Sequence, residues 1–107
     1  MFLSNMEIIP QKKITKHLGL VQGSTVRAKN VGRDILAGFK NMLGGELVAY
    51  TELMAEARDE ATDRMIKQAE GMGANGVINV RFATSSVAQG AAEIFAYGTA
   101  VTLEDSI

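Results

Sequence analysis

The longest regular pattern in this chain lies between residues 46 and 70, where apolar residues recur every three or four positions. They are Leu47, Tyr50, Met54, Ala57, Ala61, Met65 and Ala69. This spacing is that of one face of an α-helix. The opposite face is charged and places Glu60 and Arg64 at the i,i+4 spacing that favours an ion pair. The pattern therefore predicts a long amphipathic helix whose charged face meets water.

Three other segments alternate apolar and polar side chains with the period of two that is typical of β-strands. They span residues 14–28, 77–84 and 92–103. The last segment is apolar on both sides, whereas the first carries Lys16 and Arg27 and is preceded by Lys12 and Lys13. Because edge strands normally carry charges that block further pairing, we expect the last strand in the middle and the first at an edge. The pattern predicts a three-stranded antiparallel sheet of order 1-3-2.

The first strand contains two glycines that interrupt its alternation. Leu18, Leu20 and Val26 share one parity, which assigns them to one face of the sheet. Gly19 and Gly23 weaken the strand and suggest a bulge or a bend.

A shorter helix is expected between the first strand and the long helix. Asn30 is a suitable N-cap, and Ile35, Phe39 and Met42 follow at helical spacing. The pair Gly44-Gly45 is expected to end it. The element order is then β-α-α-β-β, an α+β fold with the helices on one face of the sheet, and residues 84–90 form the turn between the last two strands.

One row of apolar side chains has no partner in this arrangement. The helices suit the small Ala and Gly row of the last strand, which leaves the larger row of that strand in water. This row consists of Phe95, Tyr97, Val101 and Leu103. An exposed row of this kind usually marks an interface, so we expect the subunits to form a homo-oligomeric ring. The alternative is that residues 2–9 cover the row within one chain.

Composition narrows the range of functions. A chain of 107 residues, 47% hydrophobic and 21% charged, fits one folded domain over residues 1–107. Its net charge of -1 removes the broad attraction that drives binding to nucleic acid or anionic membranes. The sequence shows neither a secretory leader nor ~20 consecutive apolar residues, so we expect a cytoplasmic protein. Without cysteine it has no thiolate nucleophile and no thiolate metal site.

A glycine pattern at residues 71–76 matches the G-x-G-x-x-G motif of dinucleotide-binding proteins. That motif must follow a strand and open a helix, so that the helix dipole faces the phosphates. Here a helix precedes the motif and a strand follows it. We interpret the glycines as a helix stop and a turn.

Candidate metal ligands are carboxylates and a single histidine. The carboxylates form a stripe on the long helix, namely Glu52, Glu56, Asp59, Glu60 and Asp63. They could hold a hard cation, although a solvated face is the favoured interpretation. His17 could supply one imidazole per subunit at a symmetry axis, and a surface histidine without metal is the favoured alternative.

No catalytic nucleophile is evident, because a serine or cysteine nucleophile needs partners that the sequence lacks. A catalytic site would have to recruit from Tyr50, Arg58, Arg81, Glu93, Tyr97 and Thr99. Arg81 and Glu93 fall on the two strands of the last hairpin and are expected to form a structural salt bridge across it. We therefore expect no enzymatic activity.

Several short motifs together resemble the YbjQ-like family of small bacterial and archaeal proteins. They are Gly44-Gly45-Glu46, Tyr50, Arg58, Gly73-Ala74-Asn75, Val77, Arg81, Glu93 and Tyr97-Gly98-Thr99-Ala100-Val101. The resemblance covers nearly the whole chain and implies a β-α-β-β subunit that assembles into a ring of five. The family's usual label is heavy-metal binding, which a chain with no cysteine and one histidine fits poorly. The resemblance supplies no catalytic residue, and the candidate binding residues are Glu46, Tyr50, Arg58, Arg81, Glu93 and Tyr97.

Three hypotheses follow. The leading one is a non-enzymatic homo-oligomer that binds a small ligand or ion between its subunits. The second is metal binding through His17 or carboxylates repeated by symmetry. The third is an enzyme with an active site between subunits that uses Tyr50, Arg58, Arg81 or Glu93.

Overall fold

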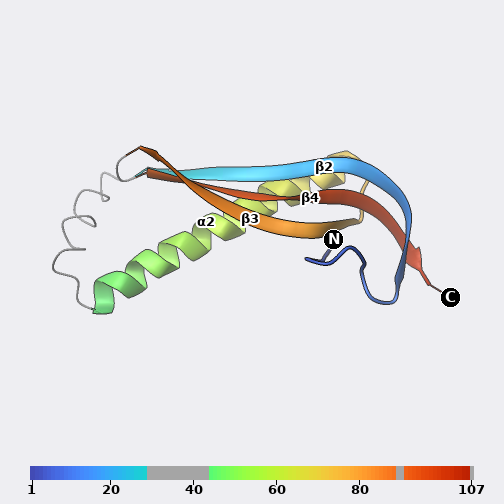
Figure 1. The fold of residues 1–107 in the computed structure, drawn as a ribbon, viewed down its shortest axis with the longest axis horizontal. Helices are drawn as coiled ribbons and strands as arrows, with labels where there is room; N and C mark the ends of the chain where they lie inside the picture. Colours follow the sequence, from blue (N-terminus) through green and yellow to red (C-terminus); the bar gives the residue numbers. More distant parts are fainter. Residues whose placement is uncertain (29–43, 89–90, 107) are drawn as a thin grey trace.

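The computed structural model describes residues 1–28, 44–88 and 91–106 of the chain. Its elements in chain order are β1 (Phe2–Leu3), β2 (Lys12–Ala28), α2 (Gly44–Gly71), β3 (Gly76–Ala88) and β4 (Ala91–Asp105), as labelled in Figure 1. The shorter helix expected between the first strand and the long helix lies outside the described residues. Strands and one long helix in separate layers confirm the α+β class.

The sheet has four strands in the order β1-β3-β4-β2. The expected three-stranded antiparallel sheet of order 1-3-2 is wrong, because the N-terminal residues add a parallel strand beside β3, with Phe2 opposite Gly76. The expected turn at residues 84–90 is also too long. β3 continues to Ala88 and β4 begins at Ala91, so the Ser and Thr residues there pair as strand. Figure 1 shows that the long strands twist over one another towards this hairpin end.

The helix α2 covers one face of the sheet, over β2 and β4 rather than β3. Its buried stripe of small residues and Met65 meets the small row of β4. The contact is formed by Ala57, Ala61, Met65, Ala69, Val21, Val77, Ile94, Ala96 and Ala100. Small side chains on both the helix and the strands allow α2 to lie close to the sheet. The expected ion pair between Arg64 and Glu60 of α2 is confirmed at 2.5 Å. None of the described helical residues forms a stretch long and apolar enough to cross a membrane.

A second, smaller core lies on the opposite face of the sheet. Ile9 from the N-terminal segment packs there against Ile78, Val101 and Leu103. The homo-oligomeric ring was predicted because the row of Phe95, Tyr97, Val101 and Leu103 was expected to be uncovered in one subunit. The structure does not support the ring, because Ile9 of the same chain covers Val101 and Leu103. Tyr97 of the same row stays 42% exposed.

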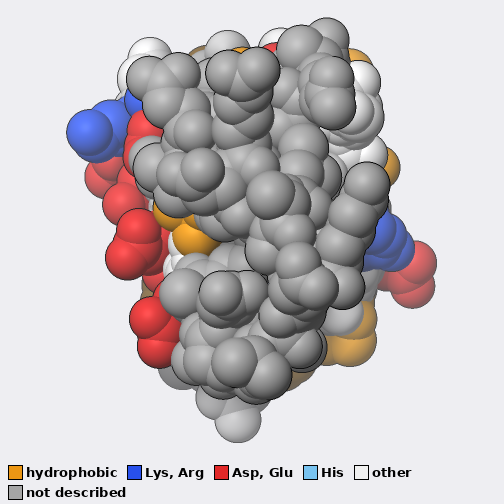
Figure 2. All heavy atoms as spheres, turned by 90° about the vertical axis from the view of Figure 1, so that its left-hand side faces the viewer, with side chains coloured by type: hydrophobic (Ala, Val, Ile, Leu, Met, Phe, Trp, Pro, Cys, Tyr) orange, Lys and Arg blue, Asp and Glu red, His pale blue; other side chains and the backbone are white. Residues whose placement is uncertain are grey.

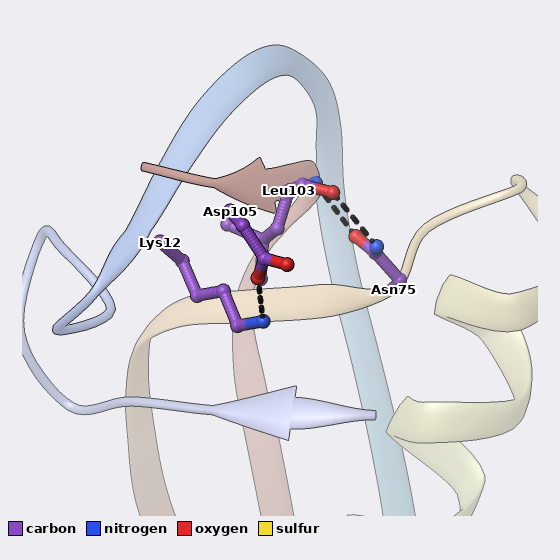
Figure 3. A network of polar contacts seen from close by, with 4 residues as sticks. All are labelled: Lys12, Asn75, Leu103 and Asp105. Atoms are coloured by element: carbon purple, nitrogen blue, oxygen red, sulfur yellow. Dashed lines mark hydrogen bonds and ion pairs between the residues drawn. The ribbon is translucent and has the colours of Figure 1, made fainter. Parts of the chain in front are cut away.

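The turn after α2 is tied to the end of β4, as Figure 3 shows. The Asn75 side chain accepts a hydrogen bond from the Leu103 N–H at 2.7 Å and donates one to the Leu103 carbonyl at 3.0 Å. Nearby, the Lys12 ammonium and the Asp105 carboxylate lie 2.5 Å apart and join the start of β2 to the end of β4. The glycine-rich segment is thus a helix stop and turn, as predicted, and its asparagine extends the pairing of the sheet.

Candidate binding site

The face of the sheet opposite α2 brings two of the predicted site residues together. In β3 and β4, Arg81 lies directly opposite Tyr97. Directly opposite residues in neighbouring strands point to the same side of a sheet. Ala96 of β4 is buried against α2, so Tyr97 and Arg81 occupy the other face. Glu93 is on the same face, but it is four residues away from Tyr97 along β4, a distance of ~14 Å.

The expected salt bridge between Arg81 and Glu93 is wrong. The register places Glu93 opposite Ser85 rather than opposite Arg81. The Arg81 guanidinium instead donates to the carbonyl oxygens of Asn5, at 2.6 Å, and Val80, at 3.0 Å. This arginine therefore fastens the N-terminal segment to β3.

The other predicted site residues come from α2 and do not join this pair. Arg58 is exposed on α2, which lies on the opposite side of the sheet from Tyr97. Glu46 and Tyr50 fall in the first turns of α2, and the structure does not describe their side chains. The candidate residues therefore do not converge on one site within the described chain.

A half-open hollow beside Tyr97 has the size of a small-molecule site. Its volume is about 380 Å³, and its lining residues are Leu20, Val21, Gln22, Gln68 and Tyr97. Gln68 reaches from α2 to the outer edge of β2, where its side-chain oxygen accepts a hydrogen bond from the Gln22 N–H at 2.6 Å. The sheet supplies an apolar wall, and the helix supplies an amide.

Sequence reasoning missed the contribution of Leu20, which is 83% exposed. The alternation put Leu20 on the same face as Leu18, which packs against the core under α2. The register shifts between His17 and Gly19, and Gly19 has a φ of 126°. This extra residue turns Leu20 to the other face, opposite Thr99. The only sequence signal for the reversal was Gly19, the glycine interpreted as a bulge or bend.

The carboxylates of α2 lie on its exposed side and remain separate from the hollow. Figure 2 shows acidic side chains gathered along one flank of the molecule. Exposed members on the helix are Glu52, Glu56, Asp59 and Asp63. Among the residues that the structure describes, no three His, Cys, Asp or Glu side chains are placed to hold one metal ion. His17 is exposed on β2, and one imidazole does not make a soft-metal site, so the described residues of a single copy assemble no site for a heavy metal.

The fold and the hollow together define a small α+β protein with a candidate ligand site at the edge of its sheet. Residues 1–104 match the model of the YbjQ family, whose description is "Putative heavy-metal-binding". The chain belongs to this family, in agreement with the resemblance of its motifs.

Relatives occur in bacteria and archaea. The chain is 71% identical to a UPF0145 protein of Hahella chejuensis over 97% of this chain and 100% of the relative. It is 55% identical to a UPF0145 protein of Archaeoglobus fulgidus over 94% of each chain. A crystal structure of a protein with unknown function from Pediococcus pentosaceus, which belongs to the DUF74 family, superposes with a TM-score of 0.65. It is 18% identical and covers 97% of this chain and 98% of its own, which shows the shared fold.

Proposed function

We propose that this protein binds a small ligand in the hollow beside Tyr97 and catalyses no reaction. The observation that carries the proposal is the hollow itself, since ~300 to 1,000 Å³ is the usual size of a small-molecule site. Leu20 and the Tyr97 ring offer apolar contact, and the Gln68 amide can donate a hydrogen bond to a ligand oxygen. These groups suit a small, flat, largely apolar molecule that carries a carbonyl or carboxylate oxygen.

The lining residues support binding rather than catalysis. They comprise two aliphatic residues, two glutamines and one tyrosine. General acid-base chemistry usually needs an imidazole or a carboxylate, and covalent chemistry needs an activated nucleophile. The lining has no imidazole or carboxylate, its titratable group is the Tyr97 phenol, and Arg58 lies on the other side of the sheet. Among the side chains that the structure describes, the candidate catalytic residues do not converge, so the enzyme hypothesis has less support than ligand binding.

Binding can be tested with a library of small aromatic amides and carboxylates. Chemical shifts of the backbone amides of Val21, Gln22 and Tyr97 report binding at the hollow. We expect Leu20→Asn to weaken binding ~10-fold, because it replaces an apolar contact with a polar one of similar size. Val26→Asn is the matched control, since Val26 is also exposed on β2 but does not line the hollow. Shift changes that gather elsewhere, or equal weakening by both substitutions, would contradict the proposal.

Metal binding is the second candidate, favoured by the description of the family model. It would require ligands from more than one copy, because one chain supplies a single histidine. The test is metal analysis of protein purified without an affinity tag, followed by calorimetry on His17→Ala and Glu56→Ala. If both variants bind the metal as the unchanged protein does, these side chains are not ligands.

We also propose that copies of the chain associate with one another, in keeping with the exposed side chains of Leu20, Val26 and Tyr97. The expectation of five copies, which came from the family resemblance, stays a prediction. So does the cytoplasmic location.

A further inference from the structure

The side-chain amide of Gln68 has its orientation fixed by the sheet. Its oxygen accepts a hydrogen bond from the Gln22 N–H at 2.6 Å. A backbone N–H can only donate, so the atom that faces it must be the amide oxygen and not the amide nitrogen. The nitrogen of Gln68, with its two N–H groups, has no acceptor among the described residues. Gln68 therefore offers the hollow hydrogen-bond donors, while its acceptor is already bonded to β2.

The backbone that carries Gln68 is held against the sheet. Met65 and Ala69, which lie on either side of it in α2, have no exposed surface. One turn earlier, the Arg64 guanidinium donates a hydrogen bond to the Ser24 carbonyl of β2. Because helix and strand are joined at both points, the Gln68 side chain spans a fixed gap. Its donor is thus positioned before a ligand arrives, which reduces the entropy that binding costs.

The other polar groups of the lining do not distinguish a donor from an acceptor in a ligand. The Tyr97 hydroxyl can donate or accept, and the Gln22 side-chain amide can present either of its ends. No side-chain hydrogen bond to a described residue fixes either group. The choice between ligand types at the hollow therefore depends on Gln68.

The lining of the hollow contains no cationic side chain. The nearest arginine along α2, Arg64, is already bonded to the Glu60 carboxylate and to the Ser24 carbonyl. A ligand carboxylate would lose part of its water without gaining an opposite charge, which costs more than the partial burial of a neutral group. A neutral carbonyl accepts the same hydrogen bond from Gln68 at a lower cost.

We propose that the hollow selects ligands with a neutral carbonyl oxygen, such as aryl ketones, and that Gln68 is the residue that sets this selectivity. This inference rests on the proposed ligand binding and narrows its ligand class from carbonyl or carboxylate to the neutral carbonyl. The Gln68 N–H donates to the ligand oxygen, while the apolar part of the ligand contacts Leu20 and the Tyr97 ring. An ammonium group finds no such partner, because the Gln68 oxygen is held by Gln22.

Three probes that share a phenyl ring and differ in their polar group test the ligand class. They are acetophenone, benzoate and benzylamine. NMR titration followed at the backbone amides of Val21, Gln22 and Tyr97 measures their affinity at the hollow, where Kd values on the order of 1 mM are expected for molecules of this size. Acetophenone should bind at least ~10-fold more tightly than either charged probe. Benzoate binding as tightly as acetophenone would overturn the preference for a neutral carbonyl.

Gln68→Glu tests the assigned residue. Glutamate has the same shape, and one of its oxygens can still accept from the Gln22 N–H, but the donor is replaced by a second, negatively charged oxygen. We expect the affinity for acetophenone to fall ~10-fold and that for benzylamine to rise, so that the preference between these two probes reverses. The matched control is Lys67→Gln, which lowers the net charge by the same amount at the neighbouring exposed position and should leave the preference unchanged.

Hydrogen exchange of the Gln22 amide shows whether Gln68→Glu keeps the bond between helix and strand. If it does not, Gln68→Met removes the donor without adding a charge, and it should weaken acetophenone binding while leaving benzylamine binding as it was.

The outcomes separate this inference from the proposed function. If acetophenone shifts the amides of the hollow but Gln68→Glu leaves the preference unchanged, the hollow binds ligands and Gln68 does not select them. If none of the three probes shifts these amides at about 10 mM, both the selectivity and the proposed binding at the hollow are overturned.

Discussion

Gly23 marks the place where α2 comes closest to the sheet. A Cβ atom built on this residue would overlap the Ala61 carbonyl and the Met65 amide nitrogen, and would lie 2.8 Å from the Arg64 Cβ. These are largely backbone atoms of a helix, which cannot move aside cheaply. The absence of a side chain at Gly23 therefore sets the distance between the two layers.

We expect Gly23→Ala to lower the free energy of unfolding by ~3 kcal/mol or more, at the upper end of overpacking effects, because the helix must lift from β2. Urea unfolding followed by circular dichroism measures the change. Gly71→Ala is the control, since a Cβ at Gly71 meets nothing within 4 Å, and it should change stability by less than ~1 kcal/mol. Equal stability of both variants would show that the layers are further apart.

Lys12 controls the ionisation of Asp105. The hydrogen bond from the Lys12 ammonium, and then its charge, hold the pKa of the Asp105 carboxyl below its ordinary value. A carboxyl whose pKa is lower in the folded than in the unfolded chain stabilises the fold at pH values above its pKa in the unfolded chain. This stabilisation is lost as the pH falls through the pKa of the folded state. We expect Lys12→Met to return the pKa of Asp105 to its ordinary value, as followed by NMR titration of the side chain.

The control for this titration is Lys13→Met, because Lys13 is opposite Glu104 in the sheet rather than opposite Asp105. It should leave the Asp105 titration where it is. A lowered pKa of Asp105 that persists without the Lys12 ammonium would assign the effect to another group.

At the scale of elements, α2 serves the sheet as a layer and also as a cover for one edge. Gln68 and Arg64 supply one acceptor and one donor to the outward backbone groups of β2, as a neighbouring strand would. Thr25, which is buried, donates a hydrogen bond to Glu60 on the same side. The charged face of α2 was predicted to meet water, but it also hydrogen-bonds to backbone groups of β2. The hydrophobic periodicity of the helix gives no sign of these contacts.

We expect Gln68→Ala to speed hydrogen exchange of the Gln22 amide ~10-fold, since its acceptor is removed and the edge is opened to water. Exchange followed by NMR measures the rate. Lys67→Ala is the control, because Lys67 is exposed on the next position of α2 and has no bond to β2 among the described contacts. If Gln22 exchanges equally slowly in both variants, Gln68 does not cap this edge.

At the scale of the whole molecule, the sheet is covered on its two faces by different parts of the chain. The helix covers one face, and Ile9 covers the end of the other, where Val101 and Leu103 lie. The rest of that second face holds Tyr97 and the hollow. The N-terminal segment thus reduces the exposed apolar surface at the end of this face, and Leu20 and Tyr97 stay exposed beside the hollow.

Ile9→Ala should lower the free energy of unfolding by ~2 to 3 kcal/mol, because it removes the cover of the second core. Ile8→Ala is a closely matched control, since Ile8 is 55% exposed and Ile9 only 7%. It should change stability by no more than ~0.5 kcal/mol. Urea unfolding of the two variants compares them, and equal effects would mean that the N-terminal segment does not pack as described.

Local patterns predicted a large part of this molecule. The 3.6-residue period of residues 46–70 predicted α2, and alternation predicted β2, β3 and β4 within a few residues at most of their ends. The site was harder to predict. Of the candidate residues, Arg81 and Tyr97 lie together, but Leu20, Gln22 and Gln68 carried no chemical motif that could have singled them out.

The sequence by itself determined the periodic elements and the α+β class, because hydrophobic period and turn residues act over a few positions. Only the tertiary structure decided the strand β1, the face on which Leu20 lies and the partners of Arg81. These depend on register and on contacts between distant residues, such as Asn5 with Arg81 and Gln22 with Gln68. One bulged residue reverses the side-chain faces that follow it, so the period of a strand fixes its alternation but not the side of the sheet to which each residue points.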